Sequence, residues 1–376
     1  MRILHIGKFY PPFFGGVEKV NFDLVERLNQ KSGCEVDELC FAHEVDYVET
    51  FIPNGYRLFR VPIWFVTFST PLPKGFVRTF FRIRKDYDII HVHVPNPIAS
   101  LVSLFAPKKA KIIIHWHSDI IKQKNLLKVF RPIQTVFLKR ADAIIATSQK
   151  YVDASRWLKP FISKVVVVPI GLDPLEMVYN QDDVYSIRKQ YEGKKLLLCI
   201  GRLTLYKGHK NLIEAVKKLN DNVVLLIGGV GEMEEELKHS VAQLNLEDRV
   251  KFIGRIPKEQ IYAYYKAADV FCLPSVTKAE AFGVVLLESL AMGTPIVTCN
   301  IEGSGVPWVN KDGETGYNVP VNDPDALADK LRLILQNEEL RKNMSMNCVK
   351  RFKKLFTLDK MVEAVYSLYK KVIEVK

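Results

Sequence analysis

Two carboxylates stand eight positions apart in the last third of the chain, separated by a glycine and an apolar run. They are Glu280 and Glu288, and Gly293 closes the apolar run. This pattern predicts a short buried helix from Val284 to Met292, with Glu280 in the loop ahead of it and Glu288 inside. At such a helix start, unpaired amides and the helix dipole favour an anion. Here those amides belong to Phe282, Gly283 and Val284.

Carboxylates accept hydrogen bonds from sugar or ribose hydroxyls. This pair next to a predicted anion-binding helix N-terminus therefore indicates a ligand with both hydroxyls and phosphate. The alternative is that Glu280 is a favourable first-turn charge and Glu288 a solvated one. The apolar residues around Glu288 argue against solvation, because a buried carboxylate needs a partner.

Two basic residues follow an expected strand from Leu196 to Gly201. Arg202 and Lys207 stand at its carboxyl end, just ahead of a helix. A guanidinium and an ammonium there can neutralise a departing diphosphate. Either one alone is more often a solvated loop charge, but the pair beside the predicted anion-binding helix N-terminus favours contact with phosphate.

Glycines also follow strands in both halves of the chain. Gly229 and Gly231 come after the next strand, and Gly16 opens the first helix. Such glycines let the backbone approach a phosphate, although a tight turn explains them equally well.

Histidines lie at the ends of two more expected strands. His115 and His117 are two residues apart. We interpret this spacing as placing their rings on opposite faces, with His117 facing a cleft and His115 packed in the interior. His91 and His93 are expected to be structural. The Asp-x-Asp at Asp86 and Asp88 precedes its strand, so it lies away from any cleft.

A bound metal or other cofactor is not expected, since no His, Cys and Asp cluster is evident in the sequence. Six scattered cysteines without a Cys-x-x-Cys pair are typical of reduced, buried thiols in a cytosolic protein. The chain starts directly with a strand, and no apolar run reaches the roughly 20 residues of a membrane-spanning helix.

Alternating strands and helices run through the 376 residues twice. Continuous Val, Ile and Leu strands predict parallel sheets covered by helices on both faces. We therefore expect an α/β fold with two doubly wound, Rossmann-like domains facing a cleft, residues 1–170 and 171–356. Residues 357–376 are expected to form a final helix with one apolar stripe.

The positive charge belongs to the first domain. Residues 1–170 carry 25 Lys and Arg against 14 Asp and Glu, a net charge of +11, and the remainder carries +1. Basic and aromatic residues interleave over 60–85 and 122–140, which favours an anionic membrane surface over ordinary core-facing helices. A nucleic-acid-binding protein is the non-enzymatic alternative, but no recognisable reading module is present.

Together these residues resemble the retaining family 4 glycosyltransferases of the GT-B type, over nearly the whole chain. The matching segments are Gly15 to Glu18, His117 to Asp119, Pro169 to Asp173, Gly201-Arg202 with Lys207-Gly208, Gly229 to Gly231, and Glu280 to Glu288. The sequence departs from the family at Ala281, where a glycine is common, and at Tyr206 and His209 in the diphosphate loop.

The resemblance implies a role for each matching position. Arg202 and Lys207 would bind the donor diphosphate, Glu280 the transferred sugar and Glu288 the ribose, with His117 beside the donor sugar. Further donor-binding positions would be the glycines and amides above together with Arg255 and Ile256. The final helix would return to the first domain, which would bind the acceptor.

Within the family, the segments 117–123 and 304–310 look most like bacterial enzymes that build O-antigen and capsule on a lipid diphosphate. This implies a hexosyltransferase at the cytoplasmic face of the plasma membrane, with a GDP-mannose-like donor favoured over UDP-hexose or UDP-N-acetylhexosamine. The acceptor would be a lipid-diphosphate-linked saccharide, with no nucleic acid partner. A nucleotide-sugar epimerase or hydrolase on the same fold remains the alternative.

Overall fold

The computed structural model describes residues 1–374 apart from 13–14, 43–47, 53–54, 68–69, 74 and 120–123, and also omits the side chains of 64–67, 70–73 and 124–129. The chain divides into two compact units. Unit 1 comprises Met1–Ile170 together with Leu358–Lys376, and unit 2 comprises Gly171–Thr357. The expected return of the final helix to the first domain is therefore confirmed.

Unit 1 is built on one sheet in the strand order β3-β4-β2-β1-β6-β7-β8-β9, with β5 paired to β4. Strands β3 and β5 are antiparallel to β4, and the other pairings are parallel. The strands are β1 (Arg2–Ile6), β2 (Glu35–Ala42), β3 (Val48–Phe51), β4 (Arg57–Thr67), β5 (Thr70–Pro73), β6 (Ile89–Val94), β7 (Lys111–Trp116), β8 (Ala143–Ala146) and β9 (Val165–Val167).

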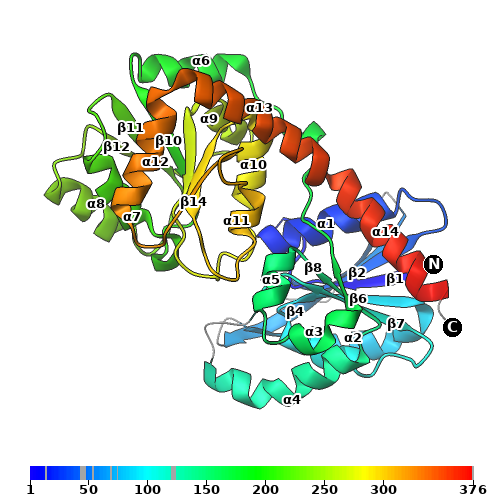
Figure 1. The fold of residues 1–376 in the computed structure, drawn as a ribbon. Helices are drawn as coiled ribbons and strands as arrows, with labels where there is room; N and C mark the ends of the chain where they lie inside the picture. Colours follow the sequence, from blue (N-terminus) through cyan, green and yellow to red (C-terminus); the bar gives the residue numbers. More distant parts are fainter. Residues whose placement is uncertain are drawn as a thin grey trace. The chain divides into compact units, whose positions relative to one another are not determined.

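Helices cover both faces of this sheet (Figure 1). On one face α1 contacts α14, and on the other α3 contacts α4. The helices of unit 1 are α1 (Gly16–Leu28), α2 (Phe76–Ile83), α3 (Pro97–Ser103), α4 (Lys124–Arg140), α5 (Gln149–Ala154) and α14 (Leu358–Glu374). Apolar residues of α14 that include Val365 and Leu368 are buried, as the stripe in the sequence predicts.

Unit 2 has a fully parallel sheet in the order β12-β11-β10-β13-β14-β15. The strands are β10 (Lys195–Ile200), β11 (Val223–Gly228), β12 (Val250–Gly254), β13 (Val270–Leu273), β14 (Ile296–Cys299) and β15 (Gly316–Val319). The order turns back at β10 and β13, which makes this a doubly wound sheet whose carboxyl edge is the expected place for a ligand.

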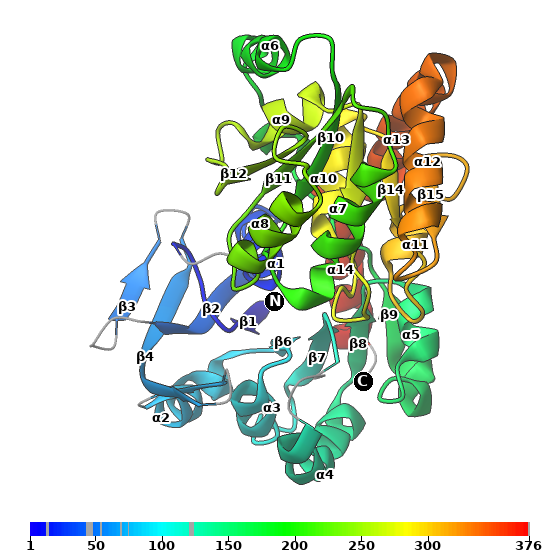
Figure 2. The same cartoon turned by 90° about the vertical axis from the view of Figure 1, so that its left-hand side faces the viewer.

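The helices of unit 2 fall into two groups that cover the two faces of the sheet (Figures 1 and 2). One contact series joins α6 to α9, α10 and α13, and the other joins α8 to α7 and α12. Their bounds are α6 (Gln181–Gln190), α7 (His209–Lys217), α8 (Glu234–Gln243), α9 (Ile261–Ala267), α10 (Val284–Met292), α11 (Val306–Val309), α12 (Pro324–Gln336) and α13 (Glu338–Leu355). Among the described residues of both units, none of the helices has the length and apolar composition needed to cross a bilayer.

Only part of the basic stretch 60–85 is exposed. Its first part is strand β4, where the Arg60 guanidinium donates to the Pro11 carbonyl at 2.6 Å. In α2 the rings of Phe76 and Phe80 are fully buried, so they belong to the core. The predicted contacts of Trp64, Phe65 and Phe68, and of Lys122, Lys124 and Lys128, fall on side chains outside the described residues.

We predict that Gly229→Ala destabilises unit 2. Gly229 has a φ of 133°, and a Cβ there would lie 1.9 Å from the Gly201 carbonyl oxygen. We expect the free energy of unfolding to fall by about 3 kcal/mol, measured by urea denaturation. The control is Gly313→Ala, whose φ is 74° but whose Cβ would meet nothing within 4 Å, with an expected cost of about 1 kcal/mol. Equal costs would show that backbone conformation alone accounts for the effect.

Candidate active site

An ion pair at the carboxyl edge of the unit 2 sheet joins two of the predicted residues. Neighbouring strands β10 and β13 lead into the loops that carry Lys207 and Glu280, respectively. The Lys207 Nζ lies 2.5 Å from Glu280 Oε2, and both side chains are largely buried, with exposed fractions of 10% and 12%. The fold thus brings together residues that are 73 positions apart in the sequence.

Electrostatics keep the Lys207 ammonium charged despite its burial. Burial lowers the pKa of Lys207, but the negative charge of Glu280 and its hydrogen bond outweigh this, and the net effect is a raised pKa. Burial, followed by the charge of Lys207, lowers the pKa of the neighbouring His209 to about 4. His209 therefore stays neutral, and the charged groups of this loop are Lys207 and Arg202.

Two serines hold the Glu280 segment in place. The Ser275 hydroxyl donates to Glu280 Oε2 at 3.0 Å, and the Ser304 hydroxyl donates to the Glu280 carbonyl oxygen at 2.5 Å. Ser275 had no signal in the sequence analysis. Its position directly after β13, beside the carboxyl edge, is the feature that would have pointed to it.

The helix start at α10 offers unpaired amides, as the sequence predicts. Among the described residues, the amides of Phe282, Gly283 and Val284 donate no hydrogen bond. The Phe282 ring is 4% exposed, and its centre lies 6.3 Å from that of Trp308 and 6.2 Å from that of Phe356. This ring packing anchors the turn, so the backbone donors can be held ready for an anion.

Glu288 lies one helical turn into α10 and is already engaged. Its Oε2 accepts a hydrogen bond from the Tyr265 hydroxyl at 2.8 Å. Burial raises the pKa of Glu288 to about 7, and the hydrogen bond from Tyr265 opposes this. A carboxyl group in this state can hydrogen-bond a hydroxyl group of a ligand while Tyr265 fixes its orientation.

The other predicted residues of unit 2 are of two kinds. The side chains of Arg202 and Arg255 are exposed and make no hydrogen bond or ion pair within the described part of the chain. Gly229 and Gly231 instead pack their backbones on the loop after β10, since a Cβ at Gly231 would lie 2.3 Å from the Leu203 carbonyl oxygen. Ile256 packs against Gly228. The two arginines are available to an anion, whereas close backbone packing already explains the glycines.

In unit 1, Gly16 is exposed at the first residue of α1, and His117 is buried, with 5% of its surface exposed. The expectation that His115 and His117 face opposite ways is wrong. Their rings are nearly parallel, with centres 4.2 Å apart, because residues two apart on a strand lie on the same face. His117 therefore belongs to the packed interior together with His115.

His117 is one of five buried histidines that gather from three adjacent strands. The others are His5 on β1, His91 and His93 on β6, and His115 on β7. Burial lowers the pKa of His117 to about 3 and that of His5 to about 4, and the pKa values of the other three are lowered as well. The cluster is thus neutral, and it forms from residues that are far apart in the sequence, where no such cluster is evident.

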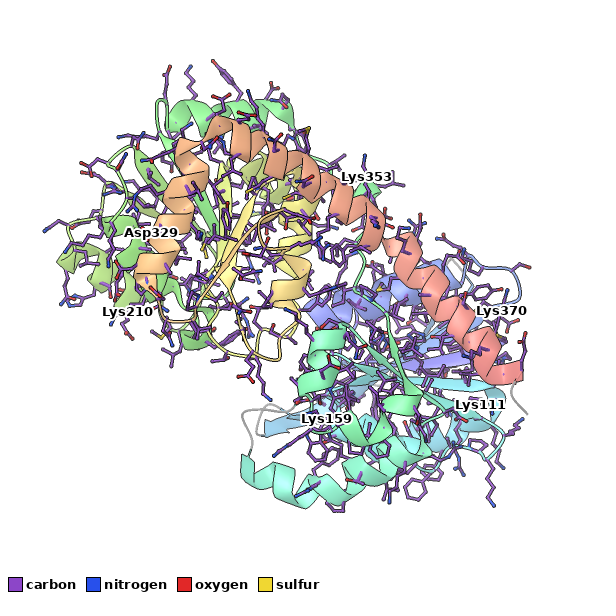
Figure 3. The ribbon with its side chains drawn as sticks, viewed as in Figure 1. Lys111, Lys159, Lys210, Asp329, Lys353 and Lys370 are labelled. Atoms are coloured by element: carbon purple, nitrogen blue, oxygen red, sulfur yellow. The ribbon has the colours of Figure 1, made fainter. Side chains whose placement is uncertain are left out.

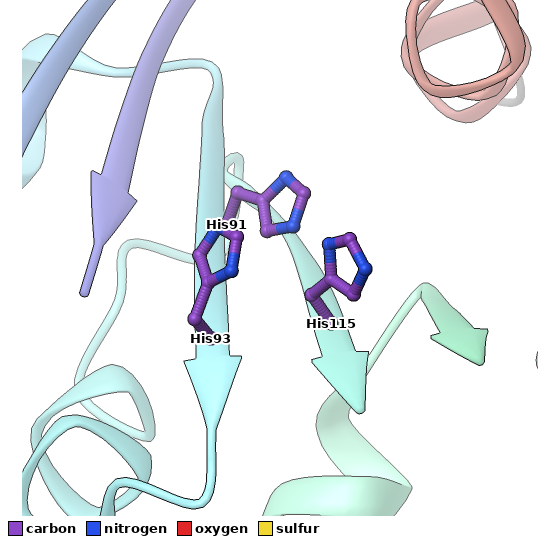
Figure 4. Close-up of side chains that lie close together, drawn as sticks. All are labelled: His91, His93 and His115. Carbon is purple, nitrogen blue, oxygen red and sulfur yellow. The ribbon is translucent and has the colours of Figure 1, made fainter. Parts of the chain in front are cut away.

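Three of these rings have the proximity of a metal site (Figure 4). One nitrogen from each of His91, His93 and His115 lies within 4.8 Å of the others. However, His93 already uses both ring nitrogens, toward His117 and His5, at 3.0 and 3.3 Å. That leaves two rings with free nitrogens, and protein zinc sites use at least three ligands.

The loop after β7 is fixed by Asp119. Its Oδ1 accepts hydrogen bonds from Trp116 Nε1 and the Ser155 hydroxyl, both at 3.0 Å, and its amide lies 2.5 Å from the Tyr151 hydroxyl. The segment His117 to Asp119 therefore has a defined conformation.

Comparison with known proteins bears on both units. A family model described as Glycosyltransferase Family 4 matches residues 14–175, and one described as Glycosyl transferases group 1 matches residues 181–351. O-antigen chain mannosyltransferase C of Escherichia coli is 32% identical, with 100% of both chains covered. The chain belongs to glycosyltransferase family 4.

A second relative is named as a sugar transferase, and two solved structures share the fold. D-rhamnosyltransferase WbpZ of Pseudomonas aeruginosa is 29% identical over 95% of this chain and 92% of the relative. The structure of sucrose-phosphate synthase from Thermosynechococcus elongatus has a TM-score of 0.82 at 22% identity, with 100% of both chains covered. That of Anabaena HepE in complex with UDP-glucose has a TM-score of 0.77 at 18% identity, covering 99% of this chain and 100% of that one. The expected fold of two Rossmann-like domains is confirmed.

We predict that the histidine cluster makes this glycosyltransferase sensitive to acid. The folded rings stay neutral while the unfolded ones take up protons below about pH 6.5, so stability is lost as the pH falls below that value. Glu38 and Glu288, whose pKa values burial raises, have the opposite effect, whereas His209, whose pKa is lowered, adds to the effect of the five clustered histidines. Each histidine contributes about 1.4 kcal/mol per pH unit.

The test compares urea unfolding at about pH 7.5 and pH 5, followed by hydrogen exchange in β6 and β7. His115→Leu removes one ring whose nitrogens have no hydrogen-bond partner among the described residues, so the loss of stability on acidification should shrink by about 1.4 kcal/mol per pH unit. His239→Ala, at an exposed position, should leave it unchanged. An unchanged pH dependence in His115→Leu would contradict the prediction.

Proposed function

We propose that this family 4 glycosyltransferase moves a hexose from a nucleotide-diphosphate sugar to a lipid-diphosphate-linked saccharide, with retention of configuration, in the synthesis of bacterial surface polysaccharide. The observation that carries the proposal is the buried Lys207–Glu280 ion pair. Within it, Glu280 lies two residues ahead of Phe282, whose amide, like that of Gly283, is unpaired among the described residues. Cationic and amide donors suit a diphosphate, and a carboxylate suits sugar hydroxyls.

In this proposal each residue acts on a different part of the donor. Lys207, Arg202 and the α10 amides bind the diphosphate and stabilise its charge as it leaves. Glu280 accepts hydrogen bonds from hydroxyls of the sugar, and Glu288 does the same for the ribose. Arg255 and Ile256 contact the base, and Gly16 and His117 are further positions that the family resemblance assigns to the donor.

We infer a single displacement at the sugar carbon without a covalent enzyme intermediate. The acceptor hydroxyl forms a new bond to the anomeric carbon on the face from which the nucleotide leaves, as the bond to the phosphate oxygen breaks. The hydroxyl proton passes to a departing phosphate oxygen. In this scheme Lys207 acts electrostatically, because its raised pKa keeps it from serving as a base.

The donor favoured by this proposal is GDP-mannose or a similar GDP-hexose. Support comes from relatives named as an O-antigen chain mannosyltransferase and a D-rhamnosyltransferase. UDP-hexose and UDP-N-acetylhexosamine come next, since HepE was solved with UDP-glucose. Residues 171–356 would bind the donor and residues 1–170 the acceptor, with residues 357–376 completing the first domain.

We further propose that unit 1 binds the anionic inner face of the plasma membrane through an apolar patch on α2 and the α3 region. The patch contains exposed apolar side chains with cations beside them. Phe81 and Phe105 are 40% and 52% exposed, with ring centres 5.6 Å apart, and the Arg84 guanidinium lies 4.3 Å from the Phe81 ring. Val77 and Leu101 extend the patch, and Arg78 and Arg82 on α2 are exposed. Aromatic rings at the acyl boundary with arginines at the headgroups fit this surface.

We predict that Lys207→Ala lowers kcat by about 100- to 1,000-fold, because an electrostatic contact to the leaving group is lost. Turnover would be measured with a panel of nucleotide sugars and short lipid-diphosphate acceptors. Lys210→Ala is the control, since Lys210 is exposed on α7 (Figure 3) and should keep normal activity. Near-normal turnover of folded Lys207→Ala would overturn the assigned role.

Two measurements separate the alternative functions, namely nucleotide release without an acceptor and DNA binding. Release of nucleotide that needs no acceptor would indicate a hydrolase or epimerase. Steeply salt-dependent DNA binding without nucleotide-sugar binding would indicate a nucleic-acid-binding protein.

We predict that Phe81→Ser weakens binding to anionic vesicles about tenfold, because a large apolar side chain no longer enters the bilayer. Co-sedimentation with vesicles of phosphatidylglycerol and phosphatidylethanolamine measures this. The control is Phe51→Ser, at a 72% exposed phenylalanine on β3, which should bind normally. Equal loss in both variants, or equal binding to neutral vesicles, would contradict the patch.

A further inference from the structure

A chain of hydrogen bonds runs through unit 1 from the final helix to His117. The Tyr369 hydroxyl on α14 bonds to His5 Nε2 at 2.8 Å and also to His91 Nδ1. His5 Nδ1 lies 3.3 Å from His93 Nε2, and His93 Nδ1 lies 3.0 Å from His117 Nε2. All four rings are at least 95% buried, so water does not compete for these contacts.

The position of one proton determines the others. His5 Nδ1 lies 2.9 Å from Asn21 Oδ1, which can only accept, so His5 carries its proton on Nδ1. Its Nε2 must then accept the Tyr369 proton, and the Tyr369 oxygen accepts in turn from His91 Nδ1. The His5 Nδ1 proton is shared between Asn21 Oδ1 and the more distant His93 Nε2. That His93 nitrogen therefore carries no proton of its own, and the neutral His93 ring is protonated on Nδ1.

The last link follows in the same way. His93 Nδ1 donates to His117 Nε2, so His117 Nε2 carries no proton. The proton of the neutral His117 ring is therefore on Nδ1. That Nδ1 has no partner among the described residues and is itself buried. An N–H in this position costs free energy until an acceptor atom meets it.

We propose that His93 is a positioning residue that fixes the ring and the tautomer of His117, so that His117 presents an N–H donor and no base at Nδ1. This rests on the proposed function in one respect, namely that the acceptor atom is an oxygen of the nucleotide sugar. Asn21 sets the proton order at one end, and Tyr369 ties the chain to α14. His117 is 5% exposed, so an acceptor atom that reaches it must belong to a ligand in direct contact with its ring.

Two variants of His93 separate the donor from the bulk of the ring. In His93→Asn the side-chain Nδ2 takes the place of the imidazole Nδ1 and still donates, whereas His93→Leu has similar size and no donor. Nitrogen-15 NMR of histidine-labelled protein at about pH 7.5 distinguishes protonated from bare ring nitrogens. His117 is assigned by its absence in His117→Phe, and exposed His239 is the internal reference.

We expect the wild type and His93→Asn to show a His117 ring protonated on Nδ1. In His93→Leu we expect a mixture of the two neutral tautomers, protonated on Nδ1 or on Nε2. We also expect kcat/KM to fall about tenfold in His93→Leu and to recover in His93→Asn. The NMR result does not depend on activity, so absence of transfer by the wild type with every donor would count against the proposed function alone.

Three results would overturn the proposal. The first is a wild-type His117 protonated on Nε2. The second is one equivalent of Zn²⁺ shifting the ring nitrogens of His91, His93 and His115 together, since His93 cannot bind a metal and also bridge two rings. Equal losses of kcat/KM in His93→Leu and His93→Asn, with both folded, would likewise reduce His93 to a packing role.

Discussion

The constraint on which both units depend is the parallel sheet, because it brings the carboxyl ends of strands distant in sequence to one edge. In unit 2 the strands β10 and β13 are neighbours, so the loops that follow them place Lys207 and Glu280 in direct contact. In unit 1 the adjacent strands β1, β6 and β7 bring together five buried histidines, and all but His91 lie in the carboxyl half of their strand or just past its end. Each unit gathers its chemistry from strand ends that the sequence separates.

Burial then decides the charge state of each group. Lys207 remains an ammonium because Glu280 compensates for the lost water, and this suits electrostatic binding of a phosphate. Among the described residues no carboxylate raises the pKa of these histidines, so all five stay neutral and can serve only as hydrogen-bonding groups. Desolvation disfavours charge in both units; in unit 2 the Glu280 carboxylate outweighs it and Lys207 stays a cation, whereas in unit 1 the histidine rings stay neutral.

Much of the fold could be predicted, since regular patterns encode it. Helix α10 has the predicted bounds, and β10 begins and ends within one residue of the strand expected from Leu196 to Gly201. Strands β2 to β5 and β15 lack a continuous run of Val, Ile and Leu, so the strand pattern does not mark them; buried Glu38 lies in the middle of β2. The contact between Lys207 and Glu280 was not predicted either, although both residues were. Their separate roles came from spacing and a family resemblance, which contain no information on side-chain distance.

The sequence by itself determined the family, the two Rossmann-like domains and the residue types available for chemistry, because local periodicity and motifs depend on neighbours along the chain. The tertiary structure decided which of those groups are paired, free or neutral. His117 illustrates the difference: its motif marked it as a candidate, but only the packing of β1, β6 and α14 supplies the partners that fix its ring. Pairing and desolvation arise between elements distant in sequence, so no local pattern could have revealed them.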